Sequence, residues 1–405
     1  MSVTTTVFEA DLPIIDYEDA ASPGEAHRNI RKALEHGPIA MGPHGPEVLS
    51  YDLVRTILRD PRLCPPPGLT LEAQGITSGP VWDKVTTGLL AINGAEHTRL
   101  RRLVSKAFTP RAVTRLDTTI TDVLNELTDP LTAAGRCDVV ADIARPYPVP
   151  VICALLGAPP EDWRLFSAWA DDIFKVFTWN VAEYEDDIMA GWDGLEAYID
   201  EMVAHRRQTL TDDLLSELIR AEDDGDHLTS DELRMLAATI LMAGTDTTRN
   251  QVAAAVDVFC DHLDQWELLA ERPDLAMNAV EEVMRYSPVI FGAMRVALED
   301  IELEGLLVPA GTFVICNTAA ANRDPAVYDE PDRLDITRDG AAPMQTFGAG
   351  AHYCLGANLA RRELAEALVV MASRMRNPRR VGPAPWKPIV GITGPATLPI
   401  EFDAR

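Results

Sequence analysis

The residues with the most distinctive chemistry lie in Phe347–Gly356, where three glycines surround one cysteine, Cys354. The following residues, from Ala357 to about Met375, are rich in Ala, Leu, Arg, Glu and Met and predict a strong helix. Cys354 therefore lies where a glycine-rich loop enters a helix N-terminus, whose free N–H groups and dipole favour a thiolate. A thiolate in such a loop can ligate iron or attack an electrophile, and the loop alone does not decide between them.

The other five cysteines do not lie in a glycine-rich loop before a helix. None of the six cysteines forms a Cys-x-x-Cys pair, so a structural zinc site is not expected. Cys153 and Cys316 lie in apolar runs, and we expect both to be reduced and buried.

A second group of reactive side chains interrupts a long helical pattern. Thr229 and Glu232 form a capping box that predicts a helix start, and the pattern continues to about Asp261. At about 1.5 Å per residue it would span roughly 45–50 Å, enough to cross a domain. Its first part is apolar nearly all round, as in a buried central helix. The stretch Ala243–Thr248 then brings glycine, an acid and alcohols, which invite a bulge or kink and are costly to bury without partners or a chemical role. A satisfied structural network is the alternative.

Basic residues gather between His97 and Arg115 without an acidic residue among them. His97 and Arg101 are four residues apart and share a helix face, so together they could hold a buried anion. A solvated helix face is the ordinary alternative. In the predicted helix Pro273–Tyr286, Glu282 and Arg285 stand three residues apart, which by itself indicates only an ion pair.

The remaining patterns predict a mainly α chain with a minor β portion. Helices are expected over Asp19–Glu35, Tyr51–Arg59, Val113–Gly135 and Pro160–His205, and short strands over Ile39–Leu49, Val289–Thr318 and Pro378–Arg405. The segment Cys64–Asn93 is expected to be irregular, either as a ligand-covering loop or as a disordered excursion. The aromatic residues between Trp163 and Trp179 would form an apolar roof if their helix covers a pocket.

The composition limits the classes of partner that the chain is expected to bind. The chain of 405 residues has a formal net charge of −27, which argues against binding nucleic acid or an anionic membrane. Met1–Asp19 has no signal-peptide pattern, and Pro146–Pro160 is too short and proline-rich to span a bilayer. We expect a cytoplasmic monomer without a membrane anchor, folded as a single domain over residues 1–405.

Taken together, these residues resemble the cytochrome P450 family, in its soluble bacterial branch, over nearly the whole chain. Four motifs carry the resemblance. The family's heme-binding pattern is matched by Phe347, Gly348, Gly350, His352, Cys354 and Gly356; its Glu-x-x-Arg by Glu282 and Arg285, with Arg323 as the arginine that joins that pair; its oxygen-activating motif by Ala243–Thr247; and its propionate-holding helix by His97 and Arg101.

The resemblance implies a P450-like fold with heme b, iron protoporphyrin IX, between the long central helix and the cysteine-loop helix. Cys354 would be the metal ligand, and Asp246 and Thr247 would be the catalytic residues that manage protons. The further cofactor contacts would be His97, Arg101, Arg295, Phe347, Gly348, His352 and Gly356, and Glu282, Arg285 and Arg323 would form a structural network.

The implied reaction inserts one oxygen atom from O2 into a lipophilic small organic substrate. The chain shows no flavin domain or dinucleotide fingerprint, so a ferredoxin and ferredoxin reductase would supply electrons. A basic patch of Arg102, Lys106, Arg111, Arg361 and Arg362 would receive an acidic ferredoxin. By family analogy, substrate contacts would come from Leu69–Leu90, Ile240, Ala243, Thr247, Val289, Ile290, further residues to Ala293, and Ile392-Thr393.

Two alternatives remain at this point. A P450-fold heme protein could act as a peroxygenase, a sensor or an isomerase-like enzyme, although the intact Asp246-Thr247 pair disfavours this. A cysteine hydrolase could use Cys354 with His352, but no third orienting group is indicated and the polar-centred helix would go unexplained.

Overall fold

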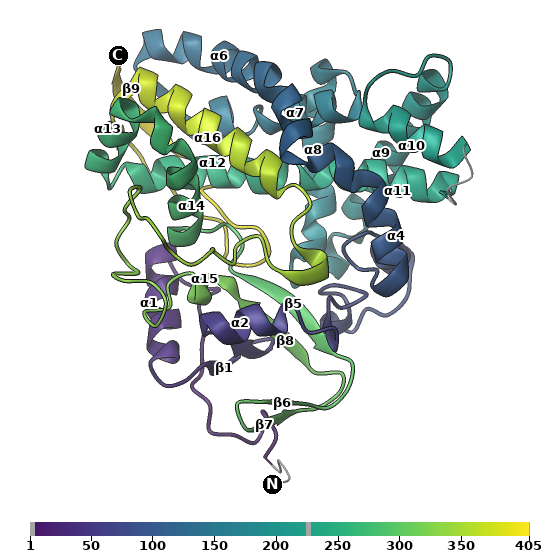
Figure 1. Ribbon diagram of the computed structural model, residues 1–405, viewed down its shortest axis with the longest axis vertical. Helices are drawn as coiled ribbons and strands as arrows, with labels where there is room; N and C mark the ends of the chain where they lie inside the picture. Colours follow the sequence, from purple (N-terminus) through teal and green to yellow (C-terminus); the bar gives the residue numbers. More distant parts are fainter. Residues whose placement is uncertain (1–4, 224–227, 405) are drawn as a thin grey trace.

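The computed structural model describes residues 5–223 and 228–404 and confirms a mainly α fold with a minor β portion. Helices fill the upper part of the molecule, and most strands lie in the lower part, near the N-terminus (Figure 1). The α-helices are α1 (Pro23–Leu34), α2 (Tyr51–Ile57), α3 (Pro80–Thr86), α4 (Gly94–Ser105), α5 (Pro110–Val113), α6 (Asp117–Ala134), α7 (Pro148–Leu156), α8 (Trp163–Ile173), α9 (Glu185–Arg206), α10 (Leu214–Asp223), α11 (Ser230–Ala243), α12 (Asp246–Phe259), α13 (Leu263–Glu271), α14 (Ala276–Tyr286), α15 (Thr318–Ala321) and α16 (Ala357–Arg374).

The main sheet joins strands from distant parts of the sequence. Its order is β1 (Ile39–Gly42), β2 (Gly45–Val48), β8 (Phe313–Asn317), β5 (Gly292–Ala297) and β3 (Leu63–Cys64), with only the β2–β8 pair parallel among these described strands. A second sheet contains β4 (Arg136–Asp138), β10 (Pro399–Ala404) and β9 (Met375–Arg380), and β6 (Ile301–Leu303) pairs with β7 (Leu306–Val308). The predicted strand regions are therefore confirmed.

The long central helix is interrupted where the sequence predicts a bulge. The capping box forms as expected, because Thr229 Oγ1 accepts from Glu232 N at 3.2 Å and Glu232 Oε2 accepts from Thr229 N at 2.8 Å. α11 then ends at Ala243, and α12 begins at Asp246. A methyl group at Gly244 would lie 2.7 Å from the Ile152 side chain of α7, so the break also needs glycine for close packing.

α16 anchors the cysteine loop to the helical core. It packs against α6, α12 and α14, and most of its residues are buried. The Tyr147 hydroxyl donates to the Glu363 carbonyl at 2.9 Å, and Trp266 Nε1 donates to the Met375 carbonyl at 2.7 Å. These two bonds fix the helix along its length.

The segment between Cys64 and Asn93 contains more structure than predicted. Its helix α3 begins with Pro80 directly after Gly79, whose φ is 103°. Proline at the first helical position is favourable because its missing N–H is not needed there. Leu69, Val81 and Val85 of this segment are buried in a hydrophobic cluster, so the alternative of a disordered excursion is wrong for most of it.

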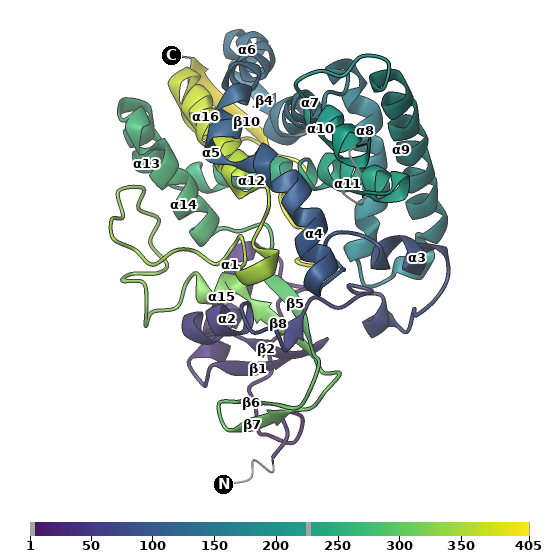
Figure 2. The ribbon, with the colours of Figure 1, turned by 45° about the vertical axis from the view of Figure 1, so that its right-hand side comes forward.

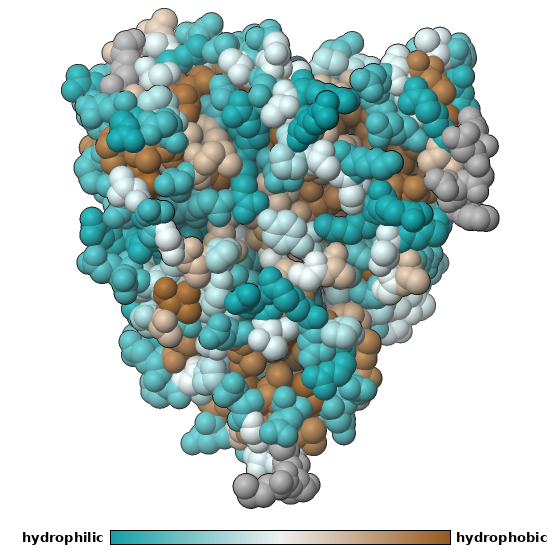
Figure 3. Space-filling view, in the orientation of Figure 1, coloured by the Kyte–Doolittle hydropathy of each residue, from teal (hydrophilic) through white to brown (hydrophobic). Residues whose placement is uncertain are grey.

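Further helices lie around the central helix and the sheet. In Figure 2, α4 lies near the sheet end of the molecule and leads up to α5, while α8 and α9 flank α11. On the face shown in Figure 3, hydrophobic residues form separate patches among hydrophilic ones.

One stretch, Val139–Leu156, is apolar and long enough to cross a membrane by length and composition, but it is 61% buried inside the molecule. Its helical course also changes between Ala144 and Pro148.

Candidate active site

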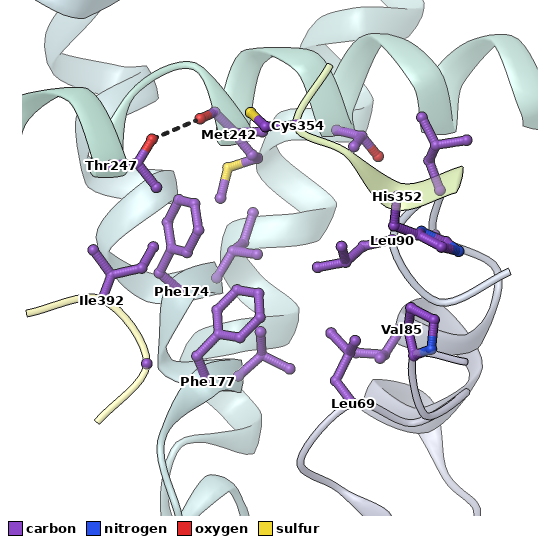
Figure 4. Close-up of a pocket in the computed structure, with 18 of the residues that line it drawn as sticks. Leu69, Val85, Leu90, Phe174, Phe177, Met242, Thr247, His352, Cys354 and Ile392 are labelled. Atoms are coloured by element: carbon purple, nitrogen blue, oxygen red, sulfur yellow. Dashed lines mark hydrogen bonds between the residues drawn. The ribbon is translucent and has the colours of Figure 1, made fainter. Parts of the chain in front are cut away.

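A cavity of about 1200 Å³ lies between the α11–α12 junction and the cysteine loop. Ala243 and Thr247 line it from the central helix, and His352 and Cys354 line it from the loop. The close-up in Figure 4 shows Thr247 and Cys354 with apolar side chains around the same space. The structure therefore brings the cysteine and the alcohol, more than a hundred residues apart in sequence, to one cavity.

Glycine geometry and one backbone hydrogen bond shape the cysteine loop. Gly348 and Gly350 have φ values of 68° and 71°, in the left-handed region that glycine adopts without strain. A methyl group at Gly350 would lie 2.6 Å from the Leu58 carbonyl oxygen. The Cys354 N–H donates to the Phe347 carbonyl at 2.9 Å, which closes the loop before α16 begins.

Burial and the groups around Cys354 act in opposite directions on the pKa of its thiol. Burial raises the pKa of the Cys354 thiol, and this effect exceeds the lowering caused by the Gly356 N–H and by the positive charges of Arg101 and Arg361. The helix start acts in the predicted direction, because the Gly356 N–H lowers the pKa of the thiol, but desolvation is the larger effect. A metal cation bound to the sulfur would supply the missing stabilisation.

Four basic side chains gather at the same cavity: His97, Arg101, Arg295 and His352. The rings of His97 and His352 stack with centroids 4.1 Å apart, and His352 Nε2 lies 2.9 Å from Asn93 Oδ1. Burial, followed by the charges of its basic neighbours, lowers the pKa of His352 to about 3, so its ring is neutral. The sequence predicted that these residues would meet, and they do.

Arg295 shows that this basic group lacks its anion. The side chain is only 6% exposed, its guanidinium donates to the neighbouring Met294 carbonyl at 2.7 Å, and burial lowers the pKa of Arg295. Among the described residues, no carboxylate pairs with Arg295 or Arg101. A buried guanidinium without a counter-charge is costly. The carboxylate groups of a heme fit this requirement.

The structural network on α14 has a different third arginine from the one predicted. Arg285 donates to Glu282 through Nε at 2.8 Å and through Nη2 at 2.9 Å, and Arg338 Nε lies 3.2 Å from both Glu282 oxygens. Arg323 instead donates from Nε to the Tyr286 carbonyl at 3.0 Å and pairs with Asp332 at 3.1 Å. The assignment of Arg323 as the residue that joins Glu282 and Arg285 is therefore wrong. Arg323 lies beside the end of α14, where the Tyr286 carbonyl accepts a hydrogen bond from it. The Glu282 carboxylate instead accepts from Arg338.

Asp246 and Thr247 face different spaces. The Thr247 hydroxyl lies in the main cavity and donates to the Ala243 carbonyl at 3.4 Å (Figure 4). Asp246, only 4% exposed, lines a separate cavity of about 200 Å³ and forms an ion pair with Arg249. Asp246 and Thr247, the first two residues of α12, thus line two different cavities directly after the break in the central helix.

Several residues around Asp246 escaped sequence reasoning. Asn250 Nδ2 donates to the Asp246 carbonyl at 2.8 Å, and Lys387 Nζ donates to Asn250 Oδ1 at 3.0 Å. Arg249 Nη2 donates to Asp171 of α8 at 2.5 Å. The (i, i+3) spacing of Asp246 and Arg249 was visible in the sequence, whereas Asp171 and Lys387 gave no local signal.

Most of the residues predicted to contact substrate line the main cavity. Ile240, Ala243, Ile290 and Ile392 line the main cavity, but Val289 does not: it is 3% exposed and its N–H donates to Gln251 Oε1 at 3.3 Å. In Figure 4, Phe174, Phe177 and Ile392 lie across the cavity from Leu69, Val85 and Leu90. Other apolar lining residues missed by the sequence reasoning are Met235, Met242, Trp192 and Met294.

Comparison with known proteins decides the family. The model of the cytochrome P450 family matches residues 163–262 and 257–376. The chain is also 38% identical over 399 residues to luteothin monooxygenase of Streptomyces thioluteus, covering 98% of this chain and 97% of that protein. This chain belongs to the cytochrome P450 family.

Further relatives agree with this assignment. Mycinamicin IV hydroxylase/epoxidase of Micromonospora griseorubida is 37% identical over 371 residues, which cover 89% of this P450 and 91% of that enzyme. Among solved structures, CalO2 has a TM-score of 0.90 at 32% identity and covers 96% of this chain and 99% of its own. The leinamycin-pathway hydroxylase LnmA of Streptomyces atroolivaceus has a TM-score of 0.82 at 37% identity, covering 96% and 100%.

The comparisons confirm the predicted fold and enzyme class. The protein is a heme-dependent P450 monooxygenase, an oxidoreductase that uses O2 to oxidise a small organic substrate.

Proposed function

We propose that this P450 inserts one oxygen atom from O2 into a lipophilic substrate, with heme b held by Cys354 and electrons supplied by a ferredoxin and its reductase. The observation that carries the proposal is the position of Cys354 and Thr247 on one largely apolar cavity. When bound, heme supplies the iron at which O2 is activated. A b-type heme is favoured over a covalently attached one because the sequence contains no Cys-x-x-Cys-His motif.

The chain's own residues bind and orient the cofactor. Cys354 Sγ would ligate the iron, and the Gly356 N–H, which lowers the pKa of the thiol, would stabilise the charge on the sulfur. Arg101, Arg295 and His97 would hold the propionate groups by donating hydrogen bonds, and the neutral ring of His352, whose Nε2 lies 2.9 Å from Asn93 Oδ1, stacks on His97 beside them. Phe347 shields the sulfur side, supported by the Arg361 guanidinium, which lies 4.4 Å from its ring centre.

Asp246 and Thr247, the first two residues of α12 after the break in the central helix, deliver protons to the main cavity. Cleaving the O–O bond with release of water consumes two protons, and a positioned acid and alcohol can hand them on. Asp246 receives protons in the smaller cavity and passes them to the Thr247 hydroxyl, which holds them at the main cavity. The intact acid–alcohol pair also supports O2 chemistry over the alternative of peroxide-driven oxidation or sensing.

A narrower basic patch than predicted supports ferredoxin docking. Arg102, Lys106 and Arg111 are exposed along α4 and α5. Arg361, however, pairs with Glu281, and Arg362 donates to Asp117 at 2.8 Å. The first three cations therefore carry the charge complementarity toward an acidic ferredoxin.

The substrate side of the cavity supports a neutral lipophilic compound. Phe174, Phe177, Leu69, Val85 and Ile392 surround the space, and such surfaces gain most from apolar molecules. Steroid, terpenoid, fatty acyl and aromatic compounds share this character.

We also infer a single-domain cytoplasmic monomer that binds neither nucleic acid nor membrane. All six cysteines are free, as is usual in a reducing compartment. The strongly acidic composition supports the absence of nucleic acid. The main cavity draws its lining from both the helical part and the β-rich part, which supports one domain.

Labelled O2 tests the reaction. Lipophilic compounds would first be screened for a ligand-induced spin shift, and the strongest ligand would be incubated with the enzyme, NADPH, a plant-type ferredoxin and its reductase. A product carrying a single labelled oxygen atom is expected. Turnover driven only by added peroxide, with no label from O2, would contradict the proposal.

A further inference from the structure

A hairpin over residues 386–395, near the C-terminus, carries a lysine that the proposed mechanism does not use. Its two arms are joined where the Lys387 N–H donates to the Gly394 carbonyl at 2.9 Å. Trp386 Nε1 donates to Asp257 Oδ2 at 3.0 Å, which ties the hairpin to α12. The hairpin is therefore fixed against the helix that carries the acid and the alcohol of the relay.

The tip of this hairpin borders both cavities. Val390 and Ile392 line the main cavity and the smaller one, and Lys387 lines the smaller one together with Asp246. One short segment thus contacts the space for the substrate and the space that holds the acid.

Asn250 of α12 connects the lysine to the acid. Lys387 Nζ donates to Asn250 Oδ1 at 3.0 Å, and Asn250 Nδ2 donates to the Asp246 carbonyl at 2.8 Å and to Asp246 Oδ1 at 3.3 Å. Asn250 is 3% exposed, and a methyl group at Gly394 would lie 2.7 Å from its Oδ1. The hairpin backbone therefore packs directly against the amide, and an unbroken series of contacts runs from the hairpin to Asp246.

The Asn250 amide has one orientation that satisfies both of its neighbours. An ammonium group offers only donors, whereas the Asp246 carboxylate and carbonyl offer acceptors, so the amide oxygen faces the lysine and the amide nitrogen faces the aspartate. Burial lowers the pKa of Lys387, whereas the charges of Asp246 and Asp171 raise it and favour the ammonium form. Among residues 5–223 and 228–404, Asn250 Oδ1 is the one hydrogen-bond acceptor of Lys387 Nζ. Without this donor the buried amide oxygen would be unsatisfied, and the amide would turn away from Asp246.

We propose that Lys387 is a positioning residue of the proton relay: through Asn250 it holds Asp246 in the geometry from which protons reach Thr247. The inference rests on the proposed monooxygenase function and extends its proton delivery to a second element of the fold. Lys387 neither gives nor takes a proton in this role, so the balance of the reaction is unchanged. The hairpin that lines the substrate cavity thereby becomes part of the relay.

Denaturant unfolding of four heme-loaded proteins tests the contact itself: the parent, Lys387→Met, Asn250→Ala and the double variant. The double variant should lose less free energy of unfolding than the sum of the two single losses, because both substitutions break the same hydrogen bond. Lys175→Met is the matched control, since Lys175 lines the same smaller cavity but donates to Asp172 and Asp187 at 2.8 and 2.7 Å. Its loss should add to that of Asn250→Ala. Additive losses for Lys387→Met would overturn the proposal.

The second readout is NADPH oxidation with a plant-type ferredoxin and its reductase, without added substrate. Lys387→Met should slow the oxidation several-fold and enlarge its solvent isotope effect, because Asp246 is no longer held for proton transfer. Lys387→Arg keeps a cationic donor and should restore both values, and Lys175→Met should change neither. Parent values in Lys387→Met would overturn the positioning role, as would a defect of equal size in Lys387→Arg.

If Lys387→Met does not load heme, Lys387→Gln decides. Its amide can turn a donor or an acceptor toward Asn250, so it does not fix the orientation, and the solvent isotope effect should exceed that of the parent. An isotope effect equal to the parent's in Lys387→Gln would overturn the proposal. Failure of the proposed function is recognised separately, since the parent would then lack a thiolate–heme spectrum.

Discussion

Two buried helices each carry an acid followed three residues later by an arginine, and the two pairs behave differently. In the Glu282–Arg285 pair of α14, the guanidinium donates to both carboxylate oxygens and to the carbonyls of Asn322, Pro331 and Arg333. In the Asp246–Arg249 pair of α12, Nη1 of Arg249 has no partner among the described residues, and both side chains line the smaller cavity.

The difference between the pairs lies in their surroundings rather than in their spacing. A network in which every donor is used is rigid and stabilises the fold, whereas an ion pair beside a cavity can exchange hydrogen bonds with water. The Glu282–Arg285 pair is therefore a structural element that holds the segment before the cysteine loop. The Asp246–Arg249 pair is suited to moving protons toward Thr247.

Breaking the closed pair should have the largest effect. Arg285→Ala leaves the Glu282 carboxylate buried with Arg338 as its one cationic partner among the described residues, and removing one partner of a buried pair costs about 3–5 kcal/mol. We expect a loss of this size in the free energy of unfolding from denaturant titration, with poor heme incorporation. An unfolding free energy equal to that of the parent would show that the network is not structural.

Removing the cavity alcohol should change the reaction and leave the fold nearly intact. Thr247→Ala deletes one weak hydrogen bond at 3.4 Å, so the free energy of unfolding should fall by about 1 kcal/mol or less. Because Thr247 holds the proton at the main cavity, NADPH consumption should be uncoupled from product and peroxide should rise several-fold. Thr245→Val is the matched control, since its hydroxyl donates to the Met242 carbonyl at 2.8 Å and does not line the cavity. Coupling at the parent level in Thr247→Ala would refute the relay.

Opening the second pair should have a smaller effect on stability than opening the first. Arg249→Gln removes the cation between Asp246 and Asp171, but both carboxylates lie beside a cavity that water can enter, so we expect a cost of about 1–3 kcal/mol. The solvent isotope effect on turnover should change, which Arg285 variants that still fold should not show. Equal losses of stability in Arg249→Gln and Arg285→Ala would remove the distinction between the pairs.

Reversing the charge of an exposed cation should have the smallest effect on the free energy of unfolding and should change only the rate of electron delivery. Arg102→Glu should leave the free energy of unfolding within about 0.5 kcal/mol of the parent, slow reduction by ferredoxin and weaken its salt dependence. Arg362→Glu is the informative comparison, because Arg362 already pairs with Asp117 and should affect docking less. Stopped-flow reduction at several salt concentrations measures the rate of reduction in both variants. A rate and a salt dependence equal to the parent's in Arg102→Glu would show that ferredoxin docks elsewhere.

Local patterns account for what the sequence predicted well. The glycines around Cys354, the capping box at Thr229 and the polar break after Ala243 act over a few residues, so their geometry follows from residue type. The spacing of His97 and Arg101 predicted that they share a helix face, the family resemblance added Arg295 and His352, and all four line the main cavity.

The predictions that were wrong depend on where side chains far apart in the sequence lie in the folded chain. Arg323 and Arg338 both follow α14 in the chain, and only the folded segment shows which of them reaches Glu282. Val289 lies beside the cavity residue Ile290 but is held by Gln251 instead. The raised pKa of Cys354 depends on burial, which a loop motif does not reveal.

Cys354 is proposed to hold the heme iron as a thiolate, with the metal offsetting the burial that raises the pKa of its thiol. The absorption spectrum of the reduced, carbon-monoxide-bound protein tests this most directly, with Cys354→Ser as the variant and Cys260→Ser as the control. We expect a thiolate–heme band in the parent and in Cys260→Ser, and its loss in Cys354→Ser. A parent without heme, or the same band in Cys354→Ser, would contradict the account.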